Sequence, residues 1–157
     1  MKELLVICGA TATGKTSLAV ECAKKLNSEV ISADSQLVYK GLNVGTAKPT
    51  QEEMQGVRHN LIDIVEPTEK FSVSDYEKLA SSEISRICAE GNIPVVCGGT
   101  GFYINSLLYN MGYGHAGAND GVREKYEKLL EECGKERLFD ELKRVDPMTA
   151  EKLHPND

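Results

Sequence analysis

The chain alternates between short apolar runs and longer stretches in which apolar residues recur every three or four positions. Short apolar runs between turn residues are typical of buried strands, and the three- to four-residue spacing is typical of amphipathic helices. The pattern predicts strands over residues 4–8, 29–32, 60–65 and 93–97. It predicts helices over residues 15–27, from residue 50, over 73–90 and over 103–108. Because strands and helices alternate, we expect an α/β fold with a mostly parallel sheet in a three-layer core.

Two of the predicted helices carry start signals. Thr50 and Glu53 have the spacing of a capping box, and Ser72 is a favourable N-cap residue. Gly91 is expected to end the helix that follows Ser72. The buried faces of the first and third helices are expected to be Leu18, Ala19, Cys22, Ala23 and Leu26, and Tyr76, Leu79, Ala80, Ile84, Ile87 and Cys88.

The chain changes character near residue 112. Residues 111–121 are rich in glycine and polar side chains, and the pattern beyond them is helical and highly charged. We therefore expect residues 1–112 to form the α/β core and residues 113–157 to form part of a helical insertion or arm. Its predicted helices cover residues 122–133, 135–145 and 148–153, separated by Gly134 and by Asp146-Pro147.

A glycine-rich loop joins the first predicted strand to the first predicted helix. It has the P-loop spacing Gly-x-x-x-x-Gly-Lys-Thr, and its residues are Gly9, Ala10, Thr11, Ala12, Thr13, Gly14, Lys15 and Thr16. Backbone N–H groups of such a loop surround a phosphate, and the positive end of the helix dipole points at the same place. Lys15 adds a mobile cation, and the Thr16 hydroxyl can hold Mg²⁺ against the phosphates. The loop predicts binding of a polyphosphate or pyrophosphate; the alternative is a glycine-rich turn with an incidental lysine.

Two further strands deliver polar residues to the same edge of the predicted sheet. Asp34 follows the strand over residues 29–32, and Gly98-Gly99-Thr100-Gly101 follows the strand over residues 93–97. Ligands of open α/β sheets bind at the carboxyl ends of the strands, so both segments are expected beside the P-loop. The glycine turn is either a second anion-facing turn or a close-packed turn that binds no ligand.

Composition narrows the class of protein. With 24 acidic and 18 basic side chains the net charge is −6, which excludes bulk attraction to nucleic acid or membranes and leaves only a local patch for either. The five cysteines are odd in number and lack Cys-x-x-Cys spacing, so we interpret them as reduced, mostly core thiols of a cytoplasmic protein. The chain has no apolar run of membrane-spanning length, Met1 leads directly into a strand, and the three histidines show no metal-site spacing. Nothing in the sequence predicts an obligate protein partner.

Four segments together resemble the tRNA dimethylallyltransferases, also called tRNA isopentenyltransferases. They are the P-loop over residues 9–16, Asp-Ser-Gln-Leu-Val-Tyr-Lys-Gly over 34–41, Val-Gly-Thr-Ala-Lys-Pro over 44–49 and Gly-Gly-Thr-Gly-Phe-Tyr over 98–103. The resemblance implies a P-loop NTPase-like core. Asn60 stands where a histidine is common in the family, and Ala10 stands where a proline is common. The family's chains are considerably longer and continue with an arginine-rich helix.

The resemblance implies a reaction. A dimethylallyl group passes from dimethylallyl diphosphate to the exocyclic N6 amine of an adenine beside the tRNA anticodon, and pyrophosphate is released. The P-loop would hold the diphosphate with Lys15 and with Mg²⁺ on Thr16, and Asp34 would act as general base. Thr100 matches a family position that contacts the RNA. The residues expected to contact tRNA are Asp34, Ser35, Gln36, Leu37, Thr100 and Arg123.

Other interpretations remain open from the residues alone. Asp34 could be a Walker-B-like aspartate that orients Mg²⁺-bound water, and Arg123 could be an ordinary solvated arginine. The same fold could bind ATP as a small nucleoside or metabolite kinase, although no arginine-rich lid precedes residue 157. The chain could also be a truncated binding fragment without catalytic activity.

Overall fold

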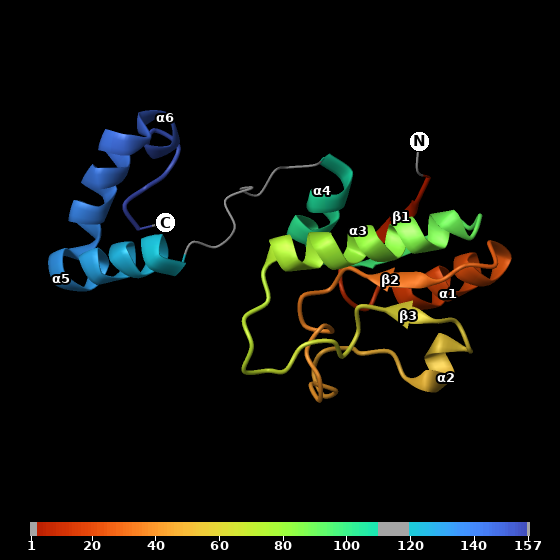
Figure 1. Ribbon diagram of the computed structural model, residues 1–157. Helices are drawn as coiled ribbons and strands as arrows, with labels where there is room; N and C mark the ends of the chain where they lie inside the picture. Colours follow the sequence, from red (N-terminus) through yellow and green to blue (C-terminus); the bar gives the residue numbers. More distant parts are fainter. Residues whose placement is uncertain (1–2, 110–119, 157) are drawn as a thin grey trace. The chain divides into compact units, whose positions relative to one another are not determined.

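The computed structural model describes residues 3–109 and 120–156. Strands and helices alternate through the first part of the chain (Figure 1). The strands are β1 (Leu5–Cys8), β2 (Val30–Ser32), β3 (His59–Asn60) and β4 (Val95–Gly98). The helices between and after them are α1 (Lys15–Lys25), α2 (Gln51–Met54), α3 (Val73–Ala89) and α4 (Gly101–Tyr109).

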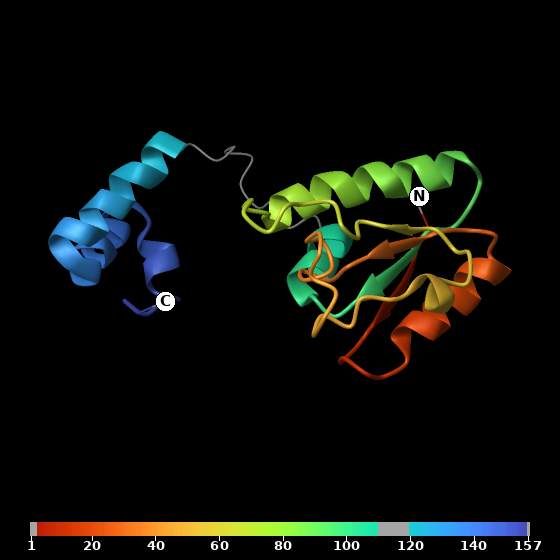
Figure 2. The ribbon, with the colours of Figure 1, turned by 90° about the horizontal axis from the view of Figure 1, so that it is seen from below.

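The four strands form one parallel sheet in the order β1-β4-β2-β3. Helix α1 covers one face of the sheet, and α3 and α4 cover the other (Figure 2). The predicted α/β class and the parallel, three-layer arrangement are therefore confirmed.

Side chains of the central strands alternate between two cores. Val30 and Val95 pack with Ala19 and Ala23 of α1, whereas Ile31 and Val96 point into the core beneath α3 and α4. In the second core, Tyr76 of α3 stacks on Tyr103 of α4 with ring centroids 3.9 Å apart. Because successive strand residues face opposite sides of a sheet, β1, β2 and β4 each contribute to both cores.

The residues predicted to start and end the helices do so. The predicted capping box of Thr50 and Glu53 forms, and the predicted N-cap residue Ser72 forms a second capping box with Asp75. Gly91 follows α3 with a φ of 84°, a left-handed conformation that favours glycine.

Three details of the pattern were predicted wrongly. Leu18 and Leu79 are half-exposed rather than buried, and Val20 takes the buried position on α1. The predicted strand over residues 60–65 is reduced to β3, because Leu61 and Asp63 adopt positive φ angles of 63° and 55° and break the extended chain.

The chain divides into two compact units, Met1–Tyr113 and Gly114–Asp157. The predicted division between residues 112 and 113 lies outside the described residues. The second unit contains α5 (Asp120–Val145) and α6 (Pro147–Ala150). Gly134 interrupts α5 with a non-helical φ of 78°, so the predicted break is confirmed, while the last helix is shorter than predicted.

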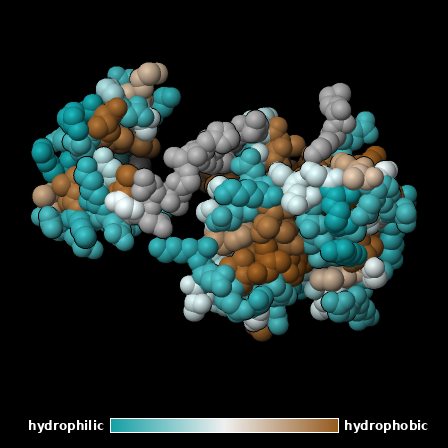
Figure 3. Space-filling view, viewed as in Figure 1, coloured by the Kyte–Doolittle hydropathy of each residue, from teal (hydrophilic) through white to brown (hydrophobic). Residues whose placement is uncertain are grey.

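Hydrophilic side chains cover most of the visible surface of the helical unit, with a few apolar side chains among them (Figure 3). The exposed apolar residues there include Leu130, Val145, Met148 and Leu153. Among the described helices, none is long and apolar enough to cross a membrane.

Candidate active site

A pocket of about 450 Å³ lies at the carboxyl ends of the strands. The loops that follow β1 and β2 contribute to it, as do Cys97 and Gly98 at the end of β4, which is the topological position expected for a ligand site. The predicted site residues that line it are Thr11, Ala12, Thr13, Gly14, Lys15, Thr16, Asp34 and Leu37. The pocket is also lined by residues that were not predicted as site residues by name, although Gly98 belongs to the glycine turn expected there: Ser17, Thr46, Ala47, Lys48, Glu53, Gln55, Cys97 and Gly98.

The P-loop turns sharply into α1. Gly14 is the N-cap residue with a φ of 80°, and no side chain caps the first turn of the helix. The amides at the start of α1 are therefore left to the pocket, where an anion would also meet the positive end of the helix dipole. The carbonyl of Ala10 accepts hydrogen bonds from the Lys15 ammonium and from the Thr13 hydroxyl, the latter at 2.8 Å.

Asp34 and Thr100 belong to turns that are joined by hydrogen bonds. The backbone N–H of Ser35 donates to the Thr100 hydroxyl oxygen at 2.9 Å, and the Thr100 N–H donates to the Ala33 carbonyl at 3.0 Å. One carboxylate oxygen of Asp34 accepts from the N–H of Gln36 at 2.8 Å. These bonds hold the Asp34 carboxylate at the pocket wall, beside the P-loop.

The glycine turn after β4 is close-packed at its first residue. A Cβ atom at Gly98 would lie 2.1 Å from the Ala33 carbonyl oxygen, which no side chain permits. A Cβ atom at Gly101 would meet nothing within 4 Å. Close packing, one of the two interpretations of this turn, therefore accounts for Gly98.

Two of the five cysteines differ from the expected core thiols. Cys8 is exposed, and so is Cys133 of the helical unit, so the prediction of core positions is wrong for both; all five cysteines are unpaired.

Burial raises the pKa of the Cys97 thiol, the Lys15 charge opposes this, and the Asp34 charge adds to it. A thiol with a raised pKa stays protonated at neutral pH, so Cys97 is not an activated nucleophile.

Arg123 belongs to the helical unit. Its side chain is exposed on α5 and forms an ion pair with Glu127, one turn along the helix, at 3.0 Å. Such an exposed pair contributes little stability, so the guanidinium remains available to a stronger anionic partner.

Lys48 lines the pocket, although the sequence did not predict it as a site residue. Its side chain is 8% exposed, and its ammonium donates to the Asp63 carboxylate at 2.5 Å and to the Tyr39 carbonyl at 3.1 Å. The segment over residues 44–49 resembles the family's. No sequence pattern predicts the contact of Lys48 with Asp63, because α2 and β3 lie between the two residues.

The parallel sheet, the glycine loop and the pocket at the strand ends define a P-loop α/β protein. Comparison with known proteins then gives the family: a family model described as "IPP transferase" matches residues 37–157. The chain therefore belongs to the IPP transferase family.

Similar proteins carry names that agree with this assignment. The tRNA dimethylallyltransferase of Caldanaerobacter subterraneus is 51% identical over 99% of this chain and 49% of its own length. That of Acetivibrio thermocellus is 48% identical over the whole chain and 50% of its own length. The chain thus spans about half the length of the curated relatives it matches.

Two solved structures are similar over the whole chain. The full-length tRNA isopentenylpyrophosphate transferase of Bacillus halodurans matches with a TM-score of 0.71 and 44% identity, over 52% of its length. A eukaryotic dimethylallyltransferase acting on tRNA matches with a TM-score of 0.83 and 31% identity, over 39% of its length.

Proposed function

We propose that this chain carries the donor site and the catalytic base of a tRNA dimethylallyltransferase. The observation that carries the proposal is the shared pocket, in which the P-loop and Asp34 face the same space. A diphosphate on the loop would bring its allylic carbon toward the carboxylate. Membership of the IPP transferase family supports this assignment.

The reaction exchanges one bond for another. The N6 amine of adenine attacks the first carbon of the dimethylallyl group, the bond from that carbon to the diphosphate oxygen breaks, and pyrophosphate leaves. Lys15 and the amides of the P-loop stabilise the negative charge on the departing oxygens. The proton lost by the amine passes to the Asp34 carboxylate.

The pocket also suits Mg²⁺. The Thr16 hydroxyl and the Asp34 carboxylate both line it, and Mg²⁺ takes one or two protein oxygens together with phosphate oxygens and water. Thr16 would hold the ion, which when bound would neutralise charge on the leaving pyrophosphate.

The acceptor is an adenine of the tRNA anticodon loop. An unpaired loop base can be turned out of its stack, so its amine can reach a recessed carboxylate. The turn over residues 34–37, with Ser35, Gln36 and Leu37, and the Thr100 hydroxyl would contact the RNA around Asp34. Arg123 would contact a phosphate with its exposed guanidinium.

The kinase alternative is less well supported. In the described part of the chain no arginine lines the pocket, whereas a kinase clamps its phosphates with arginines during transfer. The two readings differ in donor, dimethylallyl diphosphate or ATP.

Thermal unfolding of this chain tests the donor site. Dimethylallyl diphosphate with Mg²⁺ at about 100 times its Kd should add about 2.7 kcal/mol to the free energy of unfolding. Lys15→Ala should lose most of that protection, and Lys40→Ala, which changes an exposed lysine outside the pocket, should keep it. Protection by ATP alone would favour the kinase, and equal protection of both variants would exclude the P-loop as donor site. A turnover assay on a C-terminally extended protein beside this chain separates an enzyme from a binding fragment.

A further inference from the structure

Lys48 presents a nearly buried charge at the edge of the pocket. Its side chain is 8% exposed, while its ion-pair partner Asp63 is 44% exposed. Burying an ammonium is costly unless it is paired and hydrogen-bonded, and here a carboxylate and the Tyr39 carbonyl supply both interactions. An ammonium has three donors, and two of them are directed at the protein itself.

These two acceptors belong to segments that run side by side. The Asp63 N–H donates to the Leu37 carbonyl at 3.0 Å, and the Ile64 N–H donates to the Val38 carbonyl at 2.8 Å. The Lys40 N–H then donates to the Val65 carbonyl at 2.8 Å. Lys48 belongs to a third segment and contacts both of these, so it fastens residues 37–40 to residues 63–65.

The same segment is fastened at its other end by Thr100. The Ser35 N–H donates to the Thr100 hydroxyl, next to Asp34. The strip over residues 34–40 therefore lies between two attachments, Thr100 near Asp34 and Lys48 near Tyr39. Asp63 adopts a φ of 55°, a conformation that a residue other than glycine keeps only where its surroundings hold it.

We propose that Lys48 is a positioning residue, which holds the strip over residues 34–40 so that Asp34 and the RNA-facing turn keep their place in the pocket. The inference rests on the function proposed above and assigns Lys48 a role distinct from that of Lys15. Lys15 binds the donor, whereas Lys48 acts on the reaction through Asp34.

The chain offers a matched control in Lys40. It lies on the same strip and pairs with Glu66 at 2.7 Å, but the two side chains are 48% and 52% exposed. Because exposed pairs contribute little, Lys40→Met should change little, whereas Lys48→Met leaves the Tyr39 carbonyl and Asp63 without their common partner.

Hydrogen exchange of this chain tests the attachment without reference to activity. Lys48→Met should speed exchange at the amides of Lys40, Asp63 and Ile64 about tenfold or more, and leave the amides of α1 unchanged. Lys40→Met should leave all of them near the parent values, apart from small changes at its own amide. Unchanged exchange in Lys48→Met, or a uniform increase through α1 as well, would overturn the proposal.

Kinetics of a C-terminally extended protein test the consequence. Lys48→Met should lower kcat about 10- to 100-fold, because small displacements of a catalytic group have effects of that size, with KM for dimethylallyl diphosphate unchanged. Asp63→Asn should lower kcat in the same way, and the double variant should lose no more than either single one. A raised donor KM would instead make Lys48 a ligand of the diphosphate and overturn the positioning role. An inactive parent enzyme would refute the proposed function, while the exchange experiment would still judge the attachment.

Discussion

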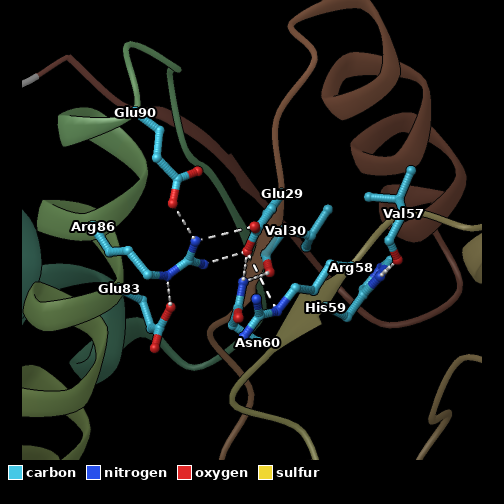
Figure 4. Close-up of polar contacts among 9 residues, drawn as sticks. All are labelled: Glu29, Val30, Val57, Arg58, His59, Asn60, Glu83, Arg86 and Glu90. Atoms are coloured by element: carbon cyan, nitrogen blue, oxygen red, sulfur yellow. Dashed lines mark hydrogen bonds and ion pairs between the residues drawn. The ribbon is translucent and has the colours of Figure 1, made fainter.

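The two ends of the sheet carry charged residues in opposite arrangements. At the amino end, the Glu29 carboxylate accepts hydrogen bonds from Arg86 at 2.5 and 3.2 Å and from the Asn60 amide at 2.8 Å (Figure 4). Arg58 approaches it at 3.6 Å, and Arg86 also donates to Glu83 and to Glu90, each at 2.9 Å. The cluster ties β2, β3 and α3 together.

At the carboxyl end, the charges of Lys15 and Asp34 are left for a ligand. Within the described residues, neither Lys15 nor Asp34 forms an ion pair, although both line the same pocket. The densest network of ion pairs thus stabilises the fold, whereas Lys15 and Asp34, the charges proposed to meet the donor and the amine, are not paired by the protein. A search by charge clustering alone would have chosen the end of the sheet opposite the candidate site.

The largest effect is expected from Gly98→Ala at the carboxyl end. The added Cβ would meet the Ala33 carbonyl oxygen at 2.1 Å and push β4 away from β2, at a cost above about 4 kcal/mol. Urea unfolding should show a chain that is largely unfolded without denaturant. Gly101→Ala, whose Cβ meets nothing within 4 Å, is the control and should remain folded. Equal stability of the two variants would show that the strands can separate freely here.

The next effect concerns Asp34 in a C-terminally extended protein. Asp34→Asn keeps an oxygen for the Gln36 N–H but removes the base, so turnover should fall about 10²–10⁴-fold while the unfolding free energy changes little. Steady-state kinetics with donor and tRNA measure the loss. If donor affinity fell by the same factor, Asp34 would be acting as a Mg²⁺ ligand instead.

At the amino end, Glu29→Gln should have the reverse profile. It weakens charge-assisted hydrogen bonds from Arg86 and should lower the unfolding free energy by about 1–3 kcal/mol, without changing protection by the donor. Glu90→Gln removes a half-exposed partner of the same arginine and should cost less than about 1 kcal/mol. A loss of donor binding in Glu29→Gln would contradict the separation of the two ends.

Acidification should remove the stability difference between the parent chain and Glu29→Gln. Burial alone would raise the pKa of Glu29, but hydrogen bonds from Arg86 and Asn60 outweigh it and hold the pKa below its ordinary value of 4.5. A lowered carboxylate pKa stabilises the fold fully above 4.5, and this contribution is lost as the pH falls through the folded-state pKa. The Tm difference between the parent and Glu29→Gln should therefore be largest near pH 7 and shrink below pH 4.5. A constant difference across that range would show that the charge of Glu29 is not responsible.

Most features that the sequence predicted depend on patterns among residues that are close together in the chain. The P-loop depends on spacing within eight residues, and strands β2 and β4 follow from short apolar runs, so both were predicted from the sequence. The bond between Ser35 and Thr100 was only implied, because topology brings their strand ends together without fixing any contact. The Lys48–Asp63 pair joins two irregular segments that have no period, and Gly98 is required by a neighbouring backbone, so neither could be read from local spacing.

The strand order has a consequence for how the phosphate loop is made. Among the described residues β1 pairs with β4 alone, and the first pair of that register, Leu5 with Val95, is separated by 90 positions in the chain. Bringing Leu5 and Val95 together costs conformational entropy before their contacts can offset it, and topologies with such distant pairings fold slowly. Strand β1 and the loop behind it should consequently reach their native form among the last parts of the core. In refolding, the ability to capture pyrophosphate should appear later than helical circular dichroism does.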